Sequence, residues 1–161
     1  MARWADFEAE GQEMAAFALS RLAARKHKTM ATLRADGSPR ISGIEVTIRD
    51  GDMWIGGMPG ARKQADLRRD PRLAIHSGSD DPAEDGSWPG DTKLCGLAVE
   101  IVDPAELAAF AGVQDSTPPA GMELFRVDLI EVSTVQLGEP VDHLVIEIWK
   151  PGAAVRRVRR E

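Results

Sequence analysis

Residues 58–71 read MPGARKQADLRRDP and lie between apolar, strand-like segments. A Pro-Gly corner opens a short polar helix there, and Asp70-Pro71 closes it, because the residue before a proline avoids the helical conformation. Arg62 and Lys63 fall in the first helical turn. Free N–H groups and the helix dipole favour negative charge at that end, so two cations there break a local electrostatic rule.

Two interpretations of this charge arrangement stay open. A phosphate held by the helix N-terminus and by both cations would resolve the conflict. Alternatively, Arg62 and Lys63 are exposed helix cations without a ligand, because short helices tolerate unfavourable end charges. The first interpretation makes this stretch a candidate anion site.

Alternating apolar segments separated by turn residues lie on both sides of the polar helix. Asp-Gly pairs at residues 36–37 and 50–51 are typical of tight hairpin turns. Strands are predicted over residues 29–34, 39–49, 53–56, 72–76, 93–103, 123–137 and 143–149. Helices are predicted over residues 6–25, from Gly60 to Asp70 and over 104–110, with loops over 77–91 and 111–121.

Hairpin signals that join most of these strands, with helices at the margins, indicate a mainly β fold with flanking helices (α+β). A mostly antiparallel barrel fits this order better than a doubly wound sheet. The length suits one domain over residues 1–161, with an N-terminal helix within residues 1–25 and a basic C-terminal tail over residues 150–161.

Charge, cysteine content and hydropathy exclude several classes of protein. A net charge of −6 argues against a general nucleic-acid binder, which needs an excess of Lys and Arg. The sequence has no long apolar run, so no membrane-spanning helix is expected. Cys95 is the only cysteine and the N-terminus lacks a secretory signal, so we expect no internal disulfide and a cytoplasmic location.

Motifs for several kinds of chemistry are missing from the sequence. We find no glycine pattern of the Rossmann or Walker type, no HExxH, no paired-cysteine zinc spacing and no serine nucleophile elbow. The sequence therefore gives little support to metal-dependent or acyl-transfer chemistry, and no metal site is expected.

Three further residues are candidates for contact with a small-molecule substrate. Glu45 lies on the face of the 39–49 strand that is directed away from the core. His76 ends a predicted strand, where it could contact a ligand or serve as a hydrogen-bonded structural residue. Trp88 lies on a polar loop, where it could cover a pocket or anchor the loop.

Four segments together resemble the pyridoxamine 5'-phosphate oxidase-like family, which belongs to the flavin split-barrel superfamily. They are TLRADGSPRIS at 32–42, GDMWI at 51–55, GARK at 60–63 and LRRDPRLA at 67–74. The resemblance extends over nearly the whole chain and implies a split β-barrel of the FMN-binding type. It also implies that Arg62 and Lys63 bind the cofactor phosphate, with Arg40 and Ser42 beside the ribityl chain. A homodimer with cofactor sites at the subunit interface is expected on the same grounds.

The C-terminus is also similar to that of the family, with informative departures. By this resemblance Trp149 of a second subunit lies near the cofactor ring, and Arg156 matches an arginine that binds substrate. The histidine that follows this arginine in the oxidases is absent here. Cys95 stands in a pair that is polar in the oxidases, and residues 56–58 lack hydroxyl side chains. These departures argue against a true pyridoxamine phosphate oxidase.

The resemblance implies an oxidoreductase that uses FMN or the deazaflavin coenzyme F-420 on an unidentified small molecule. In such an enzyme the cofactor carries the redox chemistry, and the protein binds, orients and shields it. A non-catalytic flavin-, haem- or tetrapyrrole-binding module on the same barrel is the alternative. Both hypotheses expect a bound anionic ligand, but only the first expects turnover of a substrate.

Overall fold

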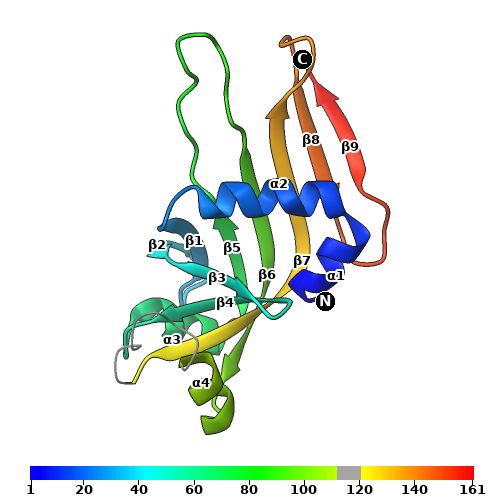
Figure 1. Cartoon of the computed structure of the whole chain (residues 1–161). Coiled ribbons are helices and arrows are strands. Elements are labelled where there is room, and N and C mark those ends of the chain that lie inside the picture. The colour runs from blue at the N-terminus through cyan, green and yellow to red at the C-terminus, as the bar shows by residue number, and fades with distance from the viewer. Residues whose placement is uncertain (112–120) are drawn as a thin grey trace.

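Nine antiparallel strands form one continuous sheet in the computed structural model, which describes residues 1–111 and 121–161 (Figure 1). The strands are β1 (Lys28–Leu33), β2 (Pro39–Ile44), β3 (Val46–Arg49), β4 (Asp52–Gly57), β5 (Arg72–His76), β6 (Asp91–Ile101), β7 (Glu123–Leu137), β8 (Leu144–Trp149) and β9 (Arg156–Arg160). The helices are α1 (Trp4–Glu10), α2 (Gln12–Ala23), α3 (Arg62–Arg69) and α4 (Pro104–Ala111). The predicted strands are thus present, with shifted ends, and β9 is additional.

The sheet curls because one predicted strand changes partner along its length. Pairing runs in the order β2-β1-β5-β6-β7-β4-β3, and only Glu45 separates β2 from β3 in the chain. β2 pairs with β1, whereas β3 pairs with β4. The single strand predicted over 39–49 is therefore two short strands. β2 and β3 do not pair with each other and lie at opposite ends of the pairing order, so the barrel is open between them.

The N-terminal segment forms two helices where the sequence predicts one over residues 6–25. Gly11 separates α1 from α2 with φ −145° and ψ 55°, which are not helical. A Cβ at Gly11 would lie 3.2 Å from a methyl carbon of Val155, so glycine lets the C-terminal segment approach here. Helical periodicity continues through Gly11 in the sequence, which is why the break was not predicted.

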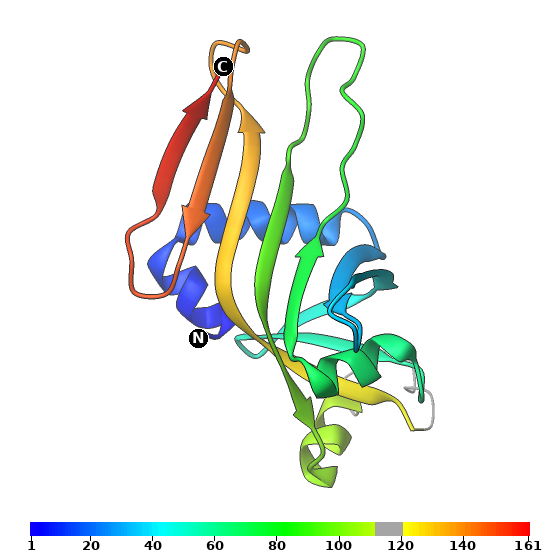
Figure 2. The ribbon, with the colours of Figure 1, turned by 180° about the vertical axis from the view of Figure 1, so that it is seen from behind.

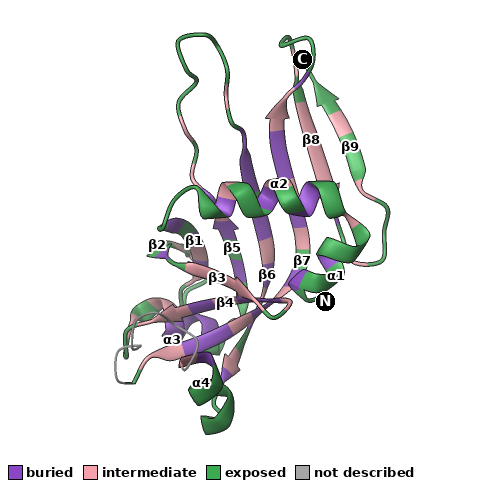
Figure 3. Cartoon of the chain, viewed as in Figure 1, coloured by how far each residue is buried: buried purple, intermediate pink, exposed green. Residues whose placement is uncertain are grey.

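The core lies between α2 and the strands that it crosses (Figure 3). One face of α2 is buried, as the amphipathic pattern predicts, through Met14, Ala15, Ala18 and Leu22. Trp4 and Phe7 of α1 and Trp149 of β8 complete this layer and have no exposed surface. A smaller cluster of Ile101, Phe110 and Leu124 lies beneath α4.

The basic C-terminal tail contains a strand, β9, which the sequence analysis does not predict. Residues 156–160 pair with β8, opposite residues 144–148, and form the edge of the sheet. Arg157 donates to Glu147 at 2.8 Å across this pair. Seen from behind, β5 to β9 lie side by side on the face away from α2 (Figure 2).

Two predicted loops have different outcomes. The loop after β5 covers residues 77–90, since β6 begins at Asp91, two residues before the predicted start. The loop predicted over 111–121 falls for the most part on residues 112–120, outside the described residues. No helix in the described part of the chain is long and apolar enough to cross a membrane.

Candidate functional site

Helix α3 begins at Arg62, so Arg62 and Lys63 occupy its first turn as predicted. Gly60 has φ +73°, a left-handed conformation that glycine adopts without a Cβ clash, and it turns the chain into the helix. Ala61 precedes the helix in an extended conformation and supplies no side-chain cap, and the first turn contains no acid. The helix N-terminus therefore presents N–H groups and two cations together.

The two cations differ in their surroundings. Arg62 is exposed and forms no ion pair with any described residue. Lys63 is half-buried, and its ammonium donates to the carbonyl oxygen of Gly43 on β2 at 2.7 Å. Burial lowers the pKa of Lys63, because no described carboxylate lies near enough to stabilise its charge. A nearby anion would offset this effect of burial, because it favours the charged form of Lys63.

Asp66, one turn after Arg62, organises the polar contacts between α3 and the sheet. Its buried carboxylate accepts from Arg40 Nε at 2.6 Å, from Thr32 Oγ1 at 3.0 Å and from Arg69 at 3.1 Å. Burial alone would raise the pKa of Asp66, but these hydrogen bonds outweigh it and lower the pKa to about 2. Asp66 thereby holds Arg40 against the helix, on the strand that also receives Lys63.

Four of the five predicted cofactor residues are brought to one side of β2. Arg40 contacts α3 through Asp66, and Lys63 reaches back to Gly43. Ser42 is half-buried and shares the face of Arg40 by strand alternation, opposite Met30 of β1. Arg62 lies beside Lys63 on the helix. The fold therefore brings Arg40 and Ser42 of β2 close to the start of α3, although the two pairs are 20 or more positions apart in the sequence.

The side chain of Gln64 occupies the space beside Gly57 of β4. In the amide orientation that satisfies both groups, Gln64 donates to the Ala61 carbonyl at 3.0 Å and accepts from the Gly57 N–H at 3.3 Å. A Cβ at Gly57 would lie 1.7 Å from this amide. Glycine at position 57 is therefore required by Gln64.

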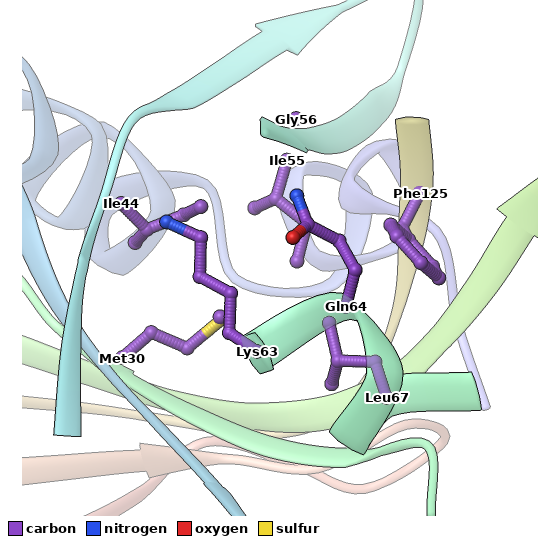
Figure 4. Close-up of a pocket in the computed structure, with 8 residues that line it drawn as sticks. All are labelled: Met30, Ile44, Ile55, Gly56, Lys63, Gln64, Leu67 and Phe125. Atoms are coloured by element: carbon purple, nitrogen blue, oxygen red, sulfur yellow. The ribbon is translucent and has the colours of Figure 1, made fainter. Parts of the chain in front are cut away.

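A small cavity lies beneath the start of α3, inside the barrel (Figure 4). It holds about 160 Å³ of space between atoms, part of it open to solvent, and Lys63 and Gln64 cover it from the helix side. Its other lining residues are apolar or glycine: Met30, Ile44, Ile55, Gly56, Leu67 and Phe125. The cavity is too small and too apolar to hold a flavin ring, so any ring would lie outside it.

The three substrate-side candidates occupy other parts of the molecule. Glu45 is exposed at the β2–β3 junction, and its Oε1 lies 3.4 Å from both Lys26 Nζ and His27 Nε2. His76 accepts a hydrogen bond at Nδ1 from the Gly78 N–H at 3.0 Å, and Trp88 donates to the Asp80 carbonyl at 2.8 Å. His76 and Trp88 thus organise the loop over residues 77–90. Neither lines the cavity beneath α3.

Trp149 lies in the core of its own chain. Its side chain has no exposed surface, packs on Phe7 with ring centroids 4.8 Å apart and donates to Glu10 at 2.9 Å. No part of the indole is left to contact a cofactor ring while α1 stays in place. Arg156 is exposed at the start of β9, opposite Ile148.

Sequence reasoning missed Asp66, Gln64 and Arg69, which shape the site from within α3. Asp66 carried a usable signal, because it is the only acid in α3 and follows Arg62 by four residues, on the same helix face. Gln64 carried none, since its role depends on contact with β4. No cluster of metal-ligating side chains occurs in the described residues.

Comparison of the sequence with models of known protein families identifies the family of this chain. The family model described as pyridoxamine 5'-phosphate oxidase matches residues 13–136, which include β1 to β6, α3 and all of β7 except its last residue. The chain belongs to the pyridoxamine 5'-phosphate oxidase family. No curated protein matches the sequence significantly.

Solved structures agree with this membership. An FMN-binding protein related to pyridoxamine 5'-phosphate oxidase, from Nostoc punctiforme, is 14% identical, with a TM-score of 0.62 over 93% of this chain and 96% of that one. PhzG from Burkholderia lata, in complex with tetrahydrophenazine-1-carboxylic acid, is 13% identical, with a TM-score of 0.58 over 93% and 89%. A heme-binding protein from Mycobacterium smegmatis is 16% identical, with a TM-score of 0.56 over 89% and 57%. The predicted FMN-binding split-barrel fold is confirmed.

Proposed function

We propose that this family member is an oxidoreductase that binds FMN or the deazaflavin coenzyme F-420 and acts on a small molecule. The observation that carries the proposal is the start of α3, where Arg62, Lys63 and uncapped N–H groups meet with no acid in the first turn. Such an arrangement suits a phosphate, which both cofactors carry. The similarity to FMN-binding split barrels supports the same ligand class.

The residues around α3 fit the phosphate end of such a cofactor. Arg62 is free to turn toward an anion, and Lys63 is half-buried without a described carboxylate partner. Binding a phosphate would raise the pKa of Lys63 and keep it charged. Arg40 and Ser42 would lie beside the ribityl chain, with Asp66 fixing the position of Arg40.

The chemistry in this proposal is divided between cofactor and protein. The bound cofactor would supply hydride or electron transfer. Arg62 and Lys63 anchor it, and Asp66 and Gln64 keep α3 rigid against the sheet, so that the anchor is preorganised. A homodimer with the cofactor at the subunit interface is part of the proposal, with the ring outside the core in which Trp149 is buried.

A non-catalytic haem- or tetrapyrrole-binding module is the second candidate function. The similarity to the heme-binding protein from Mycobacterium smegmatis favours it. His76, a possible axial ligand by residue type, already uses Nδ1 as an acceptor and lies 3.4 Å from Asp91 through Nε2. The local contacts therefore favour the flavin proposal.

Titration of the purified protein with FMN and with F-420 tests the proposal. We expect one of them to bind, and the Arg62→Ala, Lys63→Ala double variant to bind it at least about tenfold more weakly, or about 1.4 kcal/mol. A Lys93→Ala, Arg160→Ala variant is the matched control, because it removes two exposed cations far along the sheet from α3. Unchanged affinity in the first variant would contradict the phosphate anchor.

Two further readouts separate the candidate functions. Binding of haem but of neither FMN nor F-420 would favour the non-catalytic module. A bound flavin that cycles between reduced and oxidised forms with an added substrate would establish the enzyme. A monomer by light scattering in the presence of cofactor would remove the interface site from the proposal.

A further inference from the structure

Lys28 is a buried cation on β1, close in sequence to the end of α2. It begins β1, is only 6% exposed and shares the inward face with Met30 and Thr32. Its ammonium donates to the carbonyl oxygens of Arg25 and Lys26, the latter at 3.0 Å, just after the end of α2. In the described parts of the chain, no carboxylate lies within ion-pair distance of this ammonium.

This environment leaves the charge of Lys28 incompletely compensated. An ammonium has three N–H donors, and two of them are used here by carbonyl groups. Burial lowers the pKa of Lys28, and only the more distant Glu45 acts in the opposite direction. Glu45 lies 3.4 Å from both Lys26 and His27, so its carboxylate interacts with these two side chains and not directly with Lys28. A buried cation without a counter-ion is costly and would gain from a bound anion.

A surface hollow lies directly against Lys28. It holds about 710 Å³ of space, part of it open to solvent, and is lined by residues of the end of α2, the start of β1 and β3. This is the split in the barrel, where β3 pairs with β4 on one edge and with no described strand on the other. The lining residues are Leu19, Leu22, Ala23, Arg25, Lys26, Lys28, Glu45, Val46, Thr47 and Ile48. Leu22, Val46 and Ile48 make its wall apolar.

We infer that this hollow binds a small amphipathic monocarboxylate, with the carboxylate on Lys28 and the apolar body against Leu22, Val46 and Ile48. A single buried cation suits one negative charge. The carboxylate of Glu45 at the rim disfavours ligands with more than one negative charge. Arg25 is already paired with Asp80, so it offers no second cation. None of the proposed cofactor contacts, Arg40, Ser42, Arg62 and Lys63, lines the hollow, so the inference does not depend on the cofactor proposal.

Titration of the full-length protein with sodium octanoate and with 1-octanol, followed by calorimetry, tests the inference. We expect the protein to bind octanoate at least about tenfold more tightly than octanol, because only octanoate compensates Lys28. Lys28→Met should remove this preference and leave octanol binding unchanged. The matched control is Lys26→Met, since the Lys26 side chain is 74% exposed and its charge is screened.

A second variant keeps the test independent of the folding of Lys28→Met. Glu45→Gln removes the carboxylate at the rim, whose side chain is 55% exposed, and should bind octanoate as tightly as the natural protein or more tightly. Equal affinity for octanoate and octanol in the natural protein would overturn the inference. So would full octanoate affinity in folded Lys28→Met, or weaker binding in Glu45→Gln.

Discussion

The start of α3 and the C-terminal β8–β9 arm both carry residues that the sequence assigns to a cofactor, but they fold differently. At α3, Arg62 and Lys63 stay available, and an internal carboxylate, Asp66, balances the neighbouring arginines. In the C-terminal arm, Trp149 is enclosed in the core by Phe7 and Glu10. The proposed anion site therefore lies within one chain, whereas the C-terminal aromatic residue is part of the core.

The comparison teaches that core packing accounts for the aromatic residue but not for the exposed cation at the start of the helix. A cation in the first turn of a helix is placed against the local field, and nothing in the described chain compensates Arg62. A tryptophan gains so much from burial that the core readily takes it up. Substitutions in each region should therefore differ in whether they alter stability or binding.

Asp66→Asn should have the largest effect on stability. The change leaves Arg40 and Arg69 without their shared carboxylate, and we expect a loss of about 3 kcal/mol, as for other broken buried ion pairs. At about 2–4 °C per kcal/mol, thermal unfolding would show this clearly. Asp70→Asn is the control, because its partner Arg72 is exposed. Equal midpoints for the two variants would show that Asp66 does not organise the site.

Acid should remove the same contribution in the natural protein. The folded-state pKa of Asp66 is lowered from 3.8 to about 2, so its stabilising effect is complete above about pH 4 and is lost as the pH falls toward 2. The difference in melting temperature between the natural protein and Asp66→Asn should therefore be constant from pH 7 to about pH 5 and shrink below about pH 4. A difference that stays constant to pH 2 would contradict the lowered pKa.

Gly57→Ala tests the packing of α3 on β4. The new methyl group would overlap the amide of buried Gln64, and we expect a loss of about 2 kcal/mol together with weaker cofactor binding. Gly56→Ala is the matched control, since the tightest contact of its Cβ would be with the flexible sulfur of Met122, at 3.3 Å, and the backbone oxygen of Glu123 would lie at 3.6 Å. Chemical denaturation of both variants measures the difference. Similar losses in the two would mean that Gln64 moves aside easily.

Trp149→Phe should have the smallest effect on cofactor binding and tests the C-terminal side of the comparison. It removes the hydrogen bond to Glu10 and leaves a small cavity in the core, and should lower stability by about 2 kcal/mol while cofactor affinity stays within about twofold. Fluorescence titration with the cofactor provides the readout. A tenfold loss of affinity in this folded variant would show that Trp149 reaches the cofactor after all.

Much of the fold could be predicted because its signals are local. Alternating segments and Asp-Gly turns fixed the positions of the strands from β1 to β8. The break at Glu45 could not be seen, because periodicity does not reveal that a strand changes partner. The same holds for β9, whose five residues gain their hydrogen bonds only from β8.

In the candidate site, too, only the features that depend on neighbouring residues in the sequence could be predicted. Arg62 and Lys63 stand out from helix electrostatics alone. Asp66 bonds to Thr32, 34 residues away, and to Arg40, 26 residues away, so its role depends on tertiary contact. The burial of Trp149 depends on Glu10, 139 residues earlier in the chain.

The phosphate anchor at α3 is tested most directly by comparing a cofactor with its phosphate-free analogue. The pair is FMN and riboflavin or, if F-420 binds, F-420 and the deazaflavin without its phosphate-bearing side chain. We expect the natural protein to prefer the phosphorylated form by at least about tenfold, and the Arg62→Ala, Lys63→Ala variant to lose that preference. Equal affinity of the natural protein for both forms would contradict the anchor.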